Sequence, residues 1–299
     1  VIAKYPNGCQ DRCFASATHD STCALGIFDG SGGENAEKVA SVASQQVLQF
    51  LQRVGRDAPA NDWEGVLTTA FVRADTVVLG SPHDLWEDSA GCTGIAAVVD
   101  LAKAQATVAH VGDSRAIHFV PSPDYTSDTM QVAWQSNDHE STERALGNRH
   151  RKSGPVSKRP TAVPEVTTIQ HVKDGSVIAL VSDGIINAYP TPEESVAAMA
   201  AQLYQCVKSR RDPAKCNESK PLLEHAISQH MGLTVLREAE KAMNEYHAAK
   251  PAAFARDDMS ISLIYVEATG EAEPSSESAL ERVEVCEREP PLQPAAEPE

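Results

Sequence analysis

The sequence predicts an α+β domain in which antiparallel sheets form the inside and helices cover the outside. Short apolar runs rich in β-branched residues recur along the chain, and each is bounded by Gly, Asp or Pro. Between these runs lie two pairs of longer segments with helical periodicity. The resulting order is not the strict strand–helix alternation of a parallel α/β sheet, so a layered antiparallel arrangement is favoured.

The elements follow from these patterns. The predicted strands are residues 23–28, 94–99, 106–111, 116–120, 176–181 and 260–266. The predicted helices are residues 35–51, 63–79, 193–208 and 222–246, with a polar loop over 209–221. The apolar runs are much too short to span a bilayer, so no membrane span is expected.

One folded domain is expected over residues 1–266. After Val266 the composition changes to Glu, Pro, Ser and Ala with almost no aromatic residues. Such a composition buries too little apolar surface to fold by itself. We therefore expect residues 267–299 to form an acidic, mostly disordered tail.

Charge and cysteine content exclude several classes of partner and site. The formal net charge is −16, with 42 acidic against 26 basic residues, so nucleic acid and anionic membranes are not expected as partners. The 7 cysteines are scattered and form no C-x-x-C pair, which argues against a zinc site and a disulfide framework. No secretory leader is recognisable, and an intracellular, cytoplasmic location is expected.

Four aspartates stand at the ends of predicted strands. Asp29 and Asp183 each follow an apolar run and precede a glycine, Asp113 follows another run, and Asp257 precedes the last one. A single Asp-Gly after a strand is more often a turn than a ligand. Several converging carboxylates without His or Cys suit a hard cation such as Mg²⁺ or Mn²⁺, and two such ions could activate a water for attack on a phosphoryl group.

The flanks of these aspartates resemble the motifs of the protein phosphatase 2C family, in the family's order, across about the first 266 residues. The segments are FDGSGG at 28–33, GCTG at 91–94, VGDSRA at 111–116, RALGN at 144–148, VSDGI at 181–185 and RDDMS at 256–260. The resemblance implies a four-layer α-β-β-α sandwich of two antiparallel sheets flanked by helices. It also implies metal-dependent hydrolysis of phosphoserine and phosphothreonine on proteins by a metal-activated water, without a covalent enzyme intermediate.

The same resemblance implies the roles of individual residues. Asp29 would bridge two ions with help from the Gly30 carbonyl, and Asp183 and Asp257 would hold the second ion. Asp113 could support a third, looser ion. Asp11 matches the acidic residue of an early metal-site motif. The expected cofactor is therefore Mg²⁺ or Mn²⁺, and the expected catalytic residues are Asp29, Asp183, Asp257 and Ser31.

The departures from the family pattern fall on catalytic positions. Ser31 stands where the family usually has a histidine that acts as general acid, and Gln10 replaces a glutamate. Pro6 lies where a phosphate-binding arginine is common, and Asp258 replaces an asparagine. These losses motivate the rival hypothesis of a pseudophosphatase that acts as a binding or scaffold protein.

Substrate recognition is less clearly marked. Arg144, Arg151 and Lys152 belong to a basic stretch that could attract a phosphorylated protein, although a solvated loop explains it as well. Only residues 140–143 separate the aspartate–histidine pair from RALGN, so the flap that the family carries there is short or missing. Gly30-Ser31-Gly32-Gly33 before a helix leaves a nucleotide-binding module as a third hypothesis, without the Lys-Ser/Thr of a P-loop. A monomer is expected.

Overall fold

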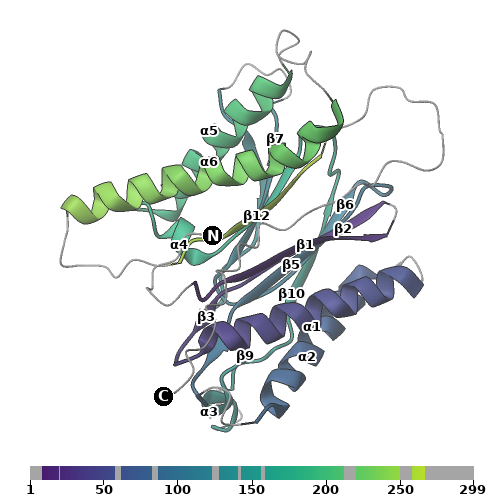
Figure 1. Cartoon of the computed structure of the whole chain (residues 1–299), viewed down its shortest axis with the longest axis vertical. Helices are drawn as coiled ribbons and strands as arrows, with labels where there is room; N and C mark the ends of the chain where they lie inside the picture. Colours follow the sequence, from purple (N-terminus) through teal and green to yellow (C-terminus); the bar gives the residue numbers. More distant parts are fainter. Residues whose placement is uncertain are drawn as a thin grey trace, which may run out of the picture.

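Two antiparallel sheets lie face to face between two pairs of helices in the computed structural model of the chain (Figure 1). The structure describes residues 9–19, 21–57, 62–82, 87–122, 128–140, 143–155, 159–211, 220–249 and 258–266. The predicted α-β-β-α sandwich is confirmed. The tail expected over 267–299 and most of the loop expected over 209–221 lie outside the described residues, so both stay predictions.

The strands form two large sheets and one small one. The first sheet has the order β1 (Arg12–His19), β2 (Thr22–Phe28), β5 (Gly94–Asp100), β6 (Gln105–Val111) and β10 (Glu165–Gln170). The second has the order β12 (Ile261–Tyr265), β11 (Val177–Val181), β7 (Arg115–Val120) and β8 (Gln131–Gln135). The small sheet joins β3 (Gly30–Ser31), β4 (Gly91–Cys92) and β9 (Leu146–Gly147).

The helices cover the outer faces of the two large sheets. The first pair is α1 (Ala36–Asp57) and α2 (Trp63–Gly80), and the second pair is α5 (Pro192–Arg211) and α6 (Lys220–Ala249). Two single-turn helices, α3 (Arg149–Lys152) and α4 (Asp183–Ile186), lie near the strand ends that matter for the site. Among the described residues, no helix is both long and apolar enough to cross a membrane.

The burial of both faces of β2 explains why the strand is apolar from Cys23 to Phe28. Leu25 and Ile27 point into the space between the sheets, where they pack with Ile178 and Leu180 of β11. Phe28 belongs to the other face, which packs against the first helix pair. Because both faces of a central strand are covered here, every position is buried and the strand reads as a continuous apolar run.

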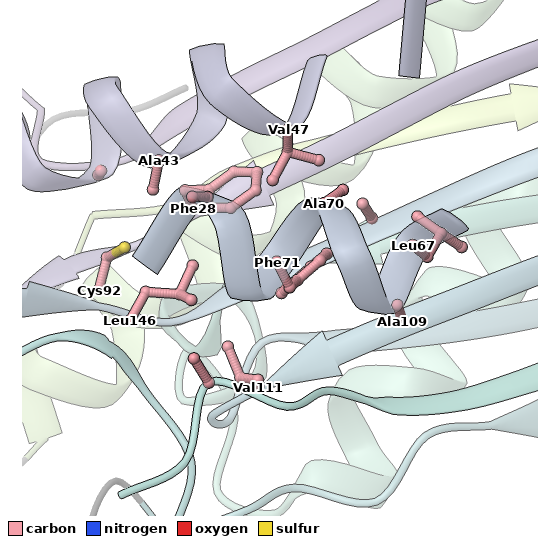
Figure 2. Close-up of a cluster of buried hydrophobic side chains, with 14 of the residues drawn as sticks. Phe28, Ala43, Val47, Leu67, Ala70, Phe71, Cys92, Ala109, Val111 and Leu146 are labelled. Carbon is pink, nitrogen blue, oxygen red and sulfur yellow. The ribbon is translucent and has the colours of Figure 1, made fainter. Parts of the chain in front are cut away.

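The core between the first sheet and α1–α2 is built around aromatic rings. Figure 2 shows Phe28 and Phe71 close to Ala43 and Val47, and the two ring centroids lie 6.0 Å apart. Fully burying a side chain of this size stabilises the fold by roughly 1.5–3 kcal/mol. Residues that recur at helical spacing in α1 and α2, such as Val39 and Leu67, are buried here, and Phe50 and Val66 are partly buried.

The sequence missed the two-residue strands of the small sheet and three longer strands that lie at the edges of the large sheets. β1 and β10 are the two edges of the first sheet, and β8 is an edge of the second. β8 is exposed at most of its positions, and β1 is rich in small and polar residues. An edge strand pairs with a neighbour on one side only and is less fully covered. Its sequence can therefore lack the apolar run that marks a central strand.

Candidate metal centre

Two pairs of acidic residues mark the ends of adjacent antiparallel strands. Asp11 precedes β1 and Asp29 follows β2, and the register pairs Arg12 with Phe28, so the two aspartates lie across from each other. On the second sheet Asp183 follows β11, and Asp258 comes shortly before β12. Antiparallel pairing therefore turns residues far apart in sequence into neighbours.

The backbone joins the two pairs into one site. The Gln10 amide donates to Asp258 Oδ2 at 2.7 Å, which links the start of β1 to the start of β12. On the second sheet the Ser260 amide donates to Ser182 Oγ at 2.9 Å. A Cβ on Gly184 would lie 2.0 Å from the Asp258 carbonyl oxygen. Close packing at this glycine brings the start of α4, with Asp183, against the Asp258 segment.

Asp11 has the electrostatic character of a cation ligand. The residue is 3% exposed, and neither carboxylate oxygen accepts a hydrogen bond from a described residue. Burial, with a further contribution from the Asp258 charge, raises the pKa of Asp11 to about 6. The side chains of Ser260, Asp29 and Ser182 lie close enough to lower this pKa, though not in hydrogen-bond geometry with Asp11. A divalent cation would relieve the cost of this buried charge, so the donor set fits Mg²⁺ or Mn²⁺.

Asp29 and Gly30 are held by the small sheet. The Thr93 amide donates to the Asp29 carbonyl at 2.9 Å, and Gly30 pairs with Cys92 of β4. A Cβ on Gly30 would lie 2.7 Å from the Ala36 carbonyl oxygen, so only glycine lets the backbone pass here.

The turn that carries Asp113 is tied to the same region. Thr93 Oγ1 and Ser114 Oγ are 2.8 Å apart, and the Thr93 amide also binds the Asp29 carbonyl. Gly112 has a φ of 93°, which a non-glycine residue rarely adopts, and this conformation turns the chain at the end of β6. Asp113 is therefore at the expected end of the sheets, as a half-buried residue.

Ser31 is exposed at the end of β3, where it pairs with Gly91. Gly32 beside it has a φ of 86°. Asp257, the remaining expected ligand, lies outside the described residues. Its role and that of Ser31 stay predictions.

The expected substrate-binding residues have different surroundings. Lys152 Nζ forms an ion pair with Asp75 Oδ1 at 2.5 Å, and both side chains are largely buried. Asp75 also accepts from the Gly147 amide at 2.8 Å, so this pair fixes the segment around β9 and α3 to α2. Arg144 donates to the Val163 carbonyl. Arg151 is the one of the three whose residue is exposed, on α3.

Two residues of this region were not predicted as ligands. Cys9 and Asp258 place a sulfur and a carboxylate oxygen within 4.8 Å of each other and of an Asp11 oxygen. A sequence signal for Asp258 existed, because it stands in the RDDMS segment just before the last strand. No sequence signal connects it to Cys9, because that contact depends on how the two sheets pack.

Comparison with known proteins agrees with the sequence resemblance. Residues 4–121 match the family model described as protein phosphatase 2C. No curated protein sequence matches the chain.

Solved structures share the fold at low sequence identity. A bacterial serine phosphatase, in a form that carries a point mutation, superposes with a TM-score of 0.59 at 15% identity, covering 89% of this chain and 95% of that one. The S. agalactiae serine/threonine phosphatase gives a TM-score of 0.54 at 16% identity, covering 89% and 97%. The phosphatase domain of SpoIIE from Bacillus subtilis, with a regulatory fragment, gives 0.51 at 15%, covering 86% and 59%.

Proposed function

The chain is protein phosphatase 2C-like, in sequence over residues 4–121 and in fold over the described residues, and from this premise we propose that it is a metal-dependent serine/threonine phosphoprotein phosphatase. The carrying observation is the buried Asp11 carboxylate without hydrogen-bond donors among the described residues, at the strand ends that also bear Asp29 and Asp183. Two Mg²⁺ or Mn²⁺ ions held there would lower the pKa of a water and neutralise charge on the phosphoryl group.

The proposed ligand roles follow the position of each oxygen. Asp29 and the Gly30 carbonyl lie where the small sheet fixes the backbone, so they would help to hold the ions. Asp183 is the first residue of α4, directly after a buried strand, and would hold the second ion with Asp257. Asp11 would contribute a further carboxylate to the metal site, and Asp113 would support a third, looser ion. Aspartates on strand ends are held rigidly, which keeps a metal site in one geometry.

Protonation of the leaving group depends on what stands at the family's general-acid position. Ser31 is exposed at the position of the family's general acid, and a serine hydroxyl is a poor proton donor near neutral pH. A phosphoserine or phosphothreonine alkoxide needs a proton as it leaves, whereas an aryl oxide needs none. We expect the enzyme to hydrolyse aryl phosphates faster than phosphopeptides.

Substrate attraction would come from Arg151. Lys152 is engaged by Asp75, so its replacement would disturb the fold and could not report on substrate binding. Arg151→Glu should raise KM for a phosphothreonine peptide several-fold without changing thermal stability, while Lys173→Glu, at an exposed position before β11, should leave KM unchanged. An unchanged KM for Arg151→Glu would remove this residue from the substrate site.

The activity is tested with a phosphothreonine peptide and p-nitrophenyl phosphate in Mn²⁺, Mg²⁺ and EDTA. Turnover should require metal and fall about 100-fold or more in Asp183→Asn, because this change removes the negative charge of one carboxylate that would hold a metal ion. Asp128→Asn is the matched control, since Asp128 forms an exposed ion pair with Lys208. It lies just before β8, whose first residue pairs with Val120 at the end of β7 opposite to Asp113. No turnover of either substrate in any metal would favour the pseudophosphatase.

A further inference from the structure

The segment that begins the described chain is held in one conformation by its own side chains. Arg12 Nη1 donates to the Cys9 carbonyl at 2.6 Å and to the Asp11 carbonyl at 2.8 Å. The Asp11 amide donates to Cys9 Sγ at 3.4 Å. The Gln10 amide is bound to Asp258 at 2.7 Å. These bonds hold the backbone of residues 9–12 and the Cys9 thiol in position.

Three potential ligand atoms, one thiol sulfur and two carboxylate oxygens, come together here. Cys9 Sγ, an Asp11 oxygen and an Asp258 oxygen all lie within 4.8 Å of one another. Asp11 and Asp258 are 3% and 2% exposed, and the Asp11 carboxylate accepts no hydrogen bond from a described residue. A buried carboxylate without a donor, close to a thiol and a second carboxylate, is the arrangement that a cation stabilises.

We propose that Cys9, Asp11 and Asp258 form a binding site for a thiophilic divalent cation such as Zn²⁺ or Co²⁺. A thiolate binds Zn²⁺ and Co²⁺ well and Mg²⁺ poorly, whereas carboxylates alone suit Mg²⁺ and Mn²⁺. The site shares Asp11 with the proposed phosphatase centre, but neither Cys9 nor Asp258 is required by that centre. The inference therefore does not rest on phosphatase activity.

The chemistry of binding is a proton exchange. A cysteine thiol is ordinarily protonated near neutral pH, so the free site holds S–H. Cation binding replaces that proton with a metal–sulfur bond and releases the proton to solvent. Three protein ligands leave at least one position of a tetrahedral ion for water.

Cobalt titration of the metal-free protein tests the site directly. The wild type should develop a thiolate-to-Co²⁺ charge-transfer band in the near ultraviolet, and Zn²⁺ should displace it. Cys9→Ser should lose the band and bind Zn²⁺ about 10-fold or more weakly. Cys206→Ser is the matched control, because Cys206 is a half-buried free thiol on α5, and it should keep the band.

Alkylation of the wild type keeps the test decisive if Cys9→Ser does not fold. Mass spectrometry should show that Zn²⁺, but not Mg²⁺, slows iodoacetamide labelling of Cys9 by about 10-fold or more, with Cys206 labelling unchanged. A missing charge-transfer band, a band that persists in Cys9→Ser, or equal labelling with and without Zn²⁺ would each overturn the proposal. None of these readouts measures turnover, so failure of the phosphatase proposal would be seen separately.

Discussion

At the scale of single residues, we expect Ser31 to limit which phosphate esters the proposed enzyme can hydrolyse. Its side chain is exposed on β3, so a larger residue fits there without disturbing the core. Histidine at this position would supply a proton donor with a pKa of about 6.5. General acid catalysis contributes ~10²–10⁴-fold when the donor is well placed.

Ser31→His should therefore raise kcat for a phosphothreonine peptide by about 10-fold or more, and change kcat for p-nitrophenyl phosphate little. Its pH–rate profile for the peptide should fall on the alkaline side, where the imidazole loses its proton. Ser31→Asn, of similar size and without a titrating group, is the control. Equal gains on both substrates would argue against a role in leaving-group protonation.

Asp11 lowers the stability of the metal-free protein. Its folded-state pKa of about 6 lies above the ordinary value of 3.8, so the folded chain binds more protons between these pH values. The free energy of unfolding therefore falls as pH rises from 3.8 through about 6, because the buried Asp11 carboxyl loses its proton. Above that range the fall is complete.

In EDTA near pH 7.5, Asp11→Asn should increase the free energy of unfolding by on the order of 1–3 kcal/mol, because the buried charge is removed. The gain should shrink near pH 5, and Mn²⁺ should stabilise the wild type more than the variant. Urea denaturation at both pH values, with and without Mn²⁺, measures this. A variant that is less stable than the wild type in EDTA at the higher pH would contradict the interpretation.

At the scale of elements, the contact between α4 and the Asp258 segment positions Asp183, which lies at the start of α4. A Cβ on Gly184 would meet the backbone oxygen of Asp258 at 2.0 Å, and backbone cannot move aside as a flexible side chain can.

Gly184→Ala should lower the free energy of unfolding by roughly 1–3 kcal/mol and weaken metal binding, because it pushes the Asp258 segment away from α4. Gly80→Ala is the matched control: a Cβ there meets nothing within 4 Å, so it should be neutral or slightly stabilising. Calorimetry in EDTA and Mn²⁺ compares the two. Equal effects of both substitutions would show that the Gly184 contact is not a constraint.

At the scale of the whole molecule, the candidate metal centre connects the two sheets at one end. Asp11 and Asp29 lie at the end of the first sheet, and Asp183 lies at the end of the second. A cation bound by both sheets should therefore slow local unfolding of the adjoining strand ends in both sheets.

Bound Mn²⁺ should add about 2.7 kcal/mol of stability at a hundred times its Kd, and slow amide exchange at the adjoining ends of β1–β2 and of β11–β12 together. The exposed edge strand β8 gives the comparison, because its local opening should change little. Hydrogen exchange with mass spectrometry measures all three regions. Protection confined to one sheet would place the ion elsewhere.

Much of the fold could be predicted from the sequence. The central strands and the four long helices were predicted within a few residues, because strands buried on both faces are continuous apolar runs and amphipathic helices repeat every 3.6 residues. β1, β8 and β10 were missed because these edge strands carry few apolar residues, whereas the edge strand β12 has an apolar run and was predicted.

The sequence by itself determined that Asp29, Asp113 and Asp183 stand at strand ends, because that depends only on local pattern. Tertiary structure alone decided that Lys152 pairs with Asp75, and that Cys9 and Asp11 meet Asp258 although Gln10 and Asp258 are 248 positions apart. Such contacts depend on strand register and on the packing of one sheet against the other. No local sequence pattern predicts the register or the sheet packing, because both follow from burying the apolar faces of distant segments together.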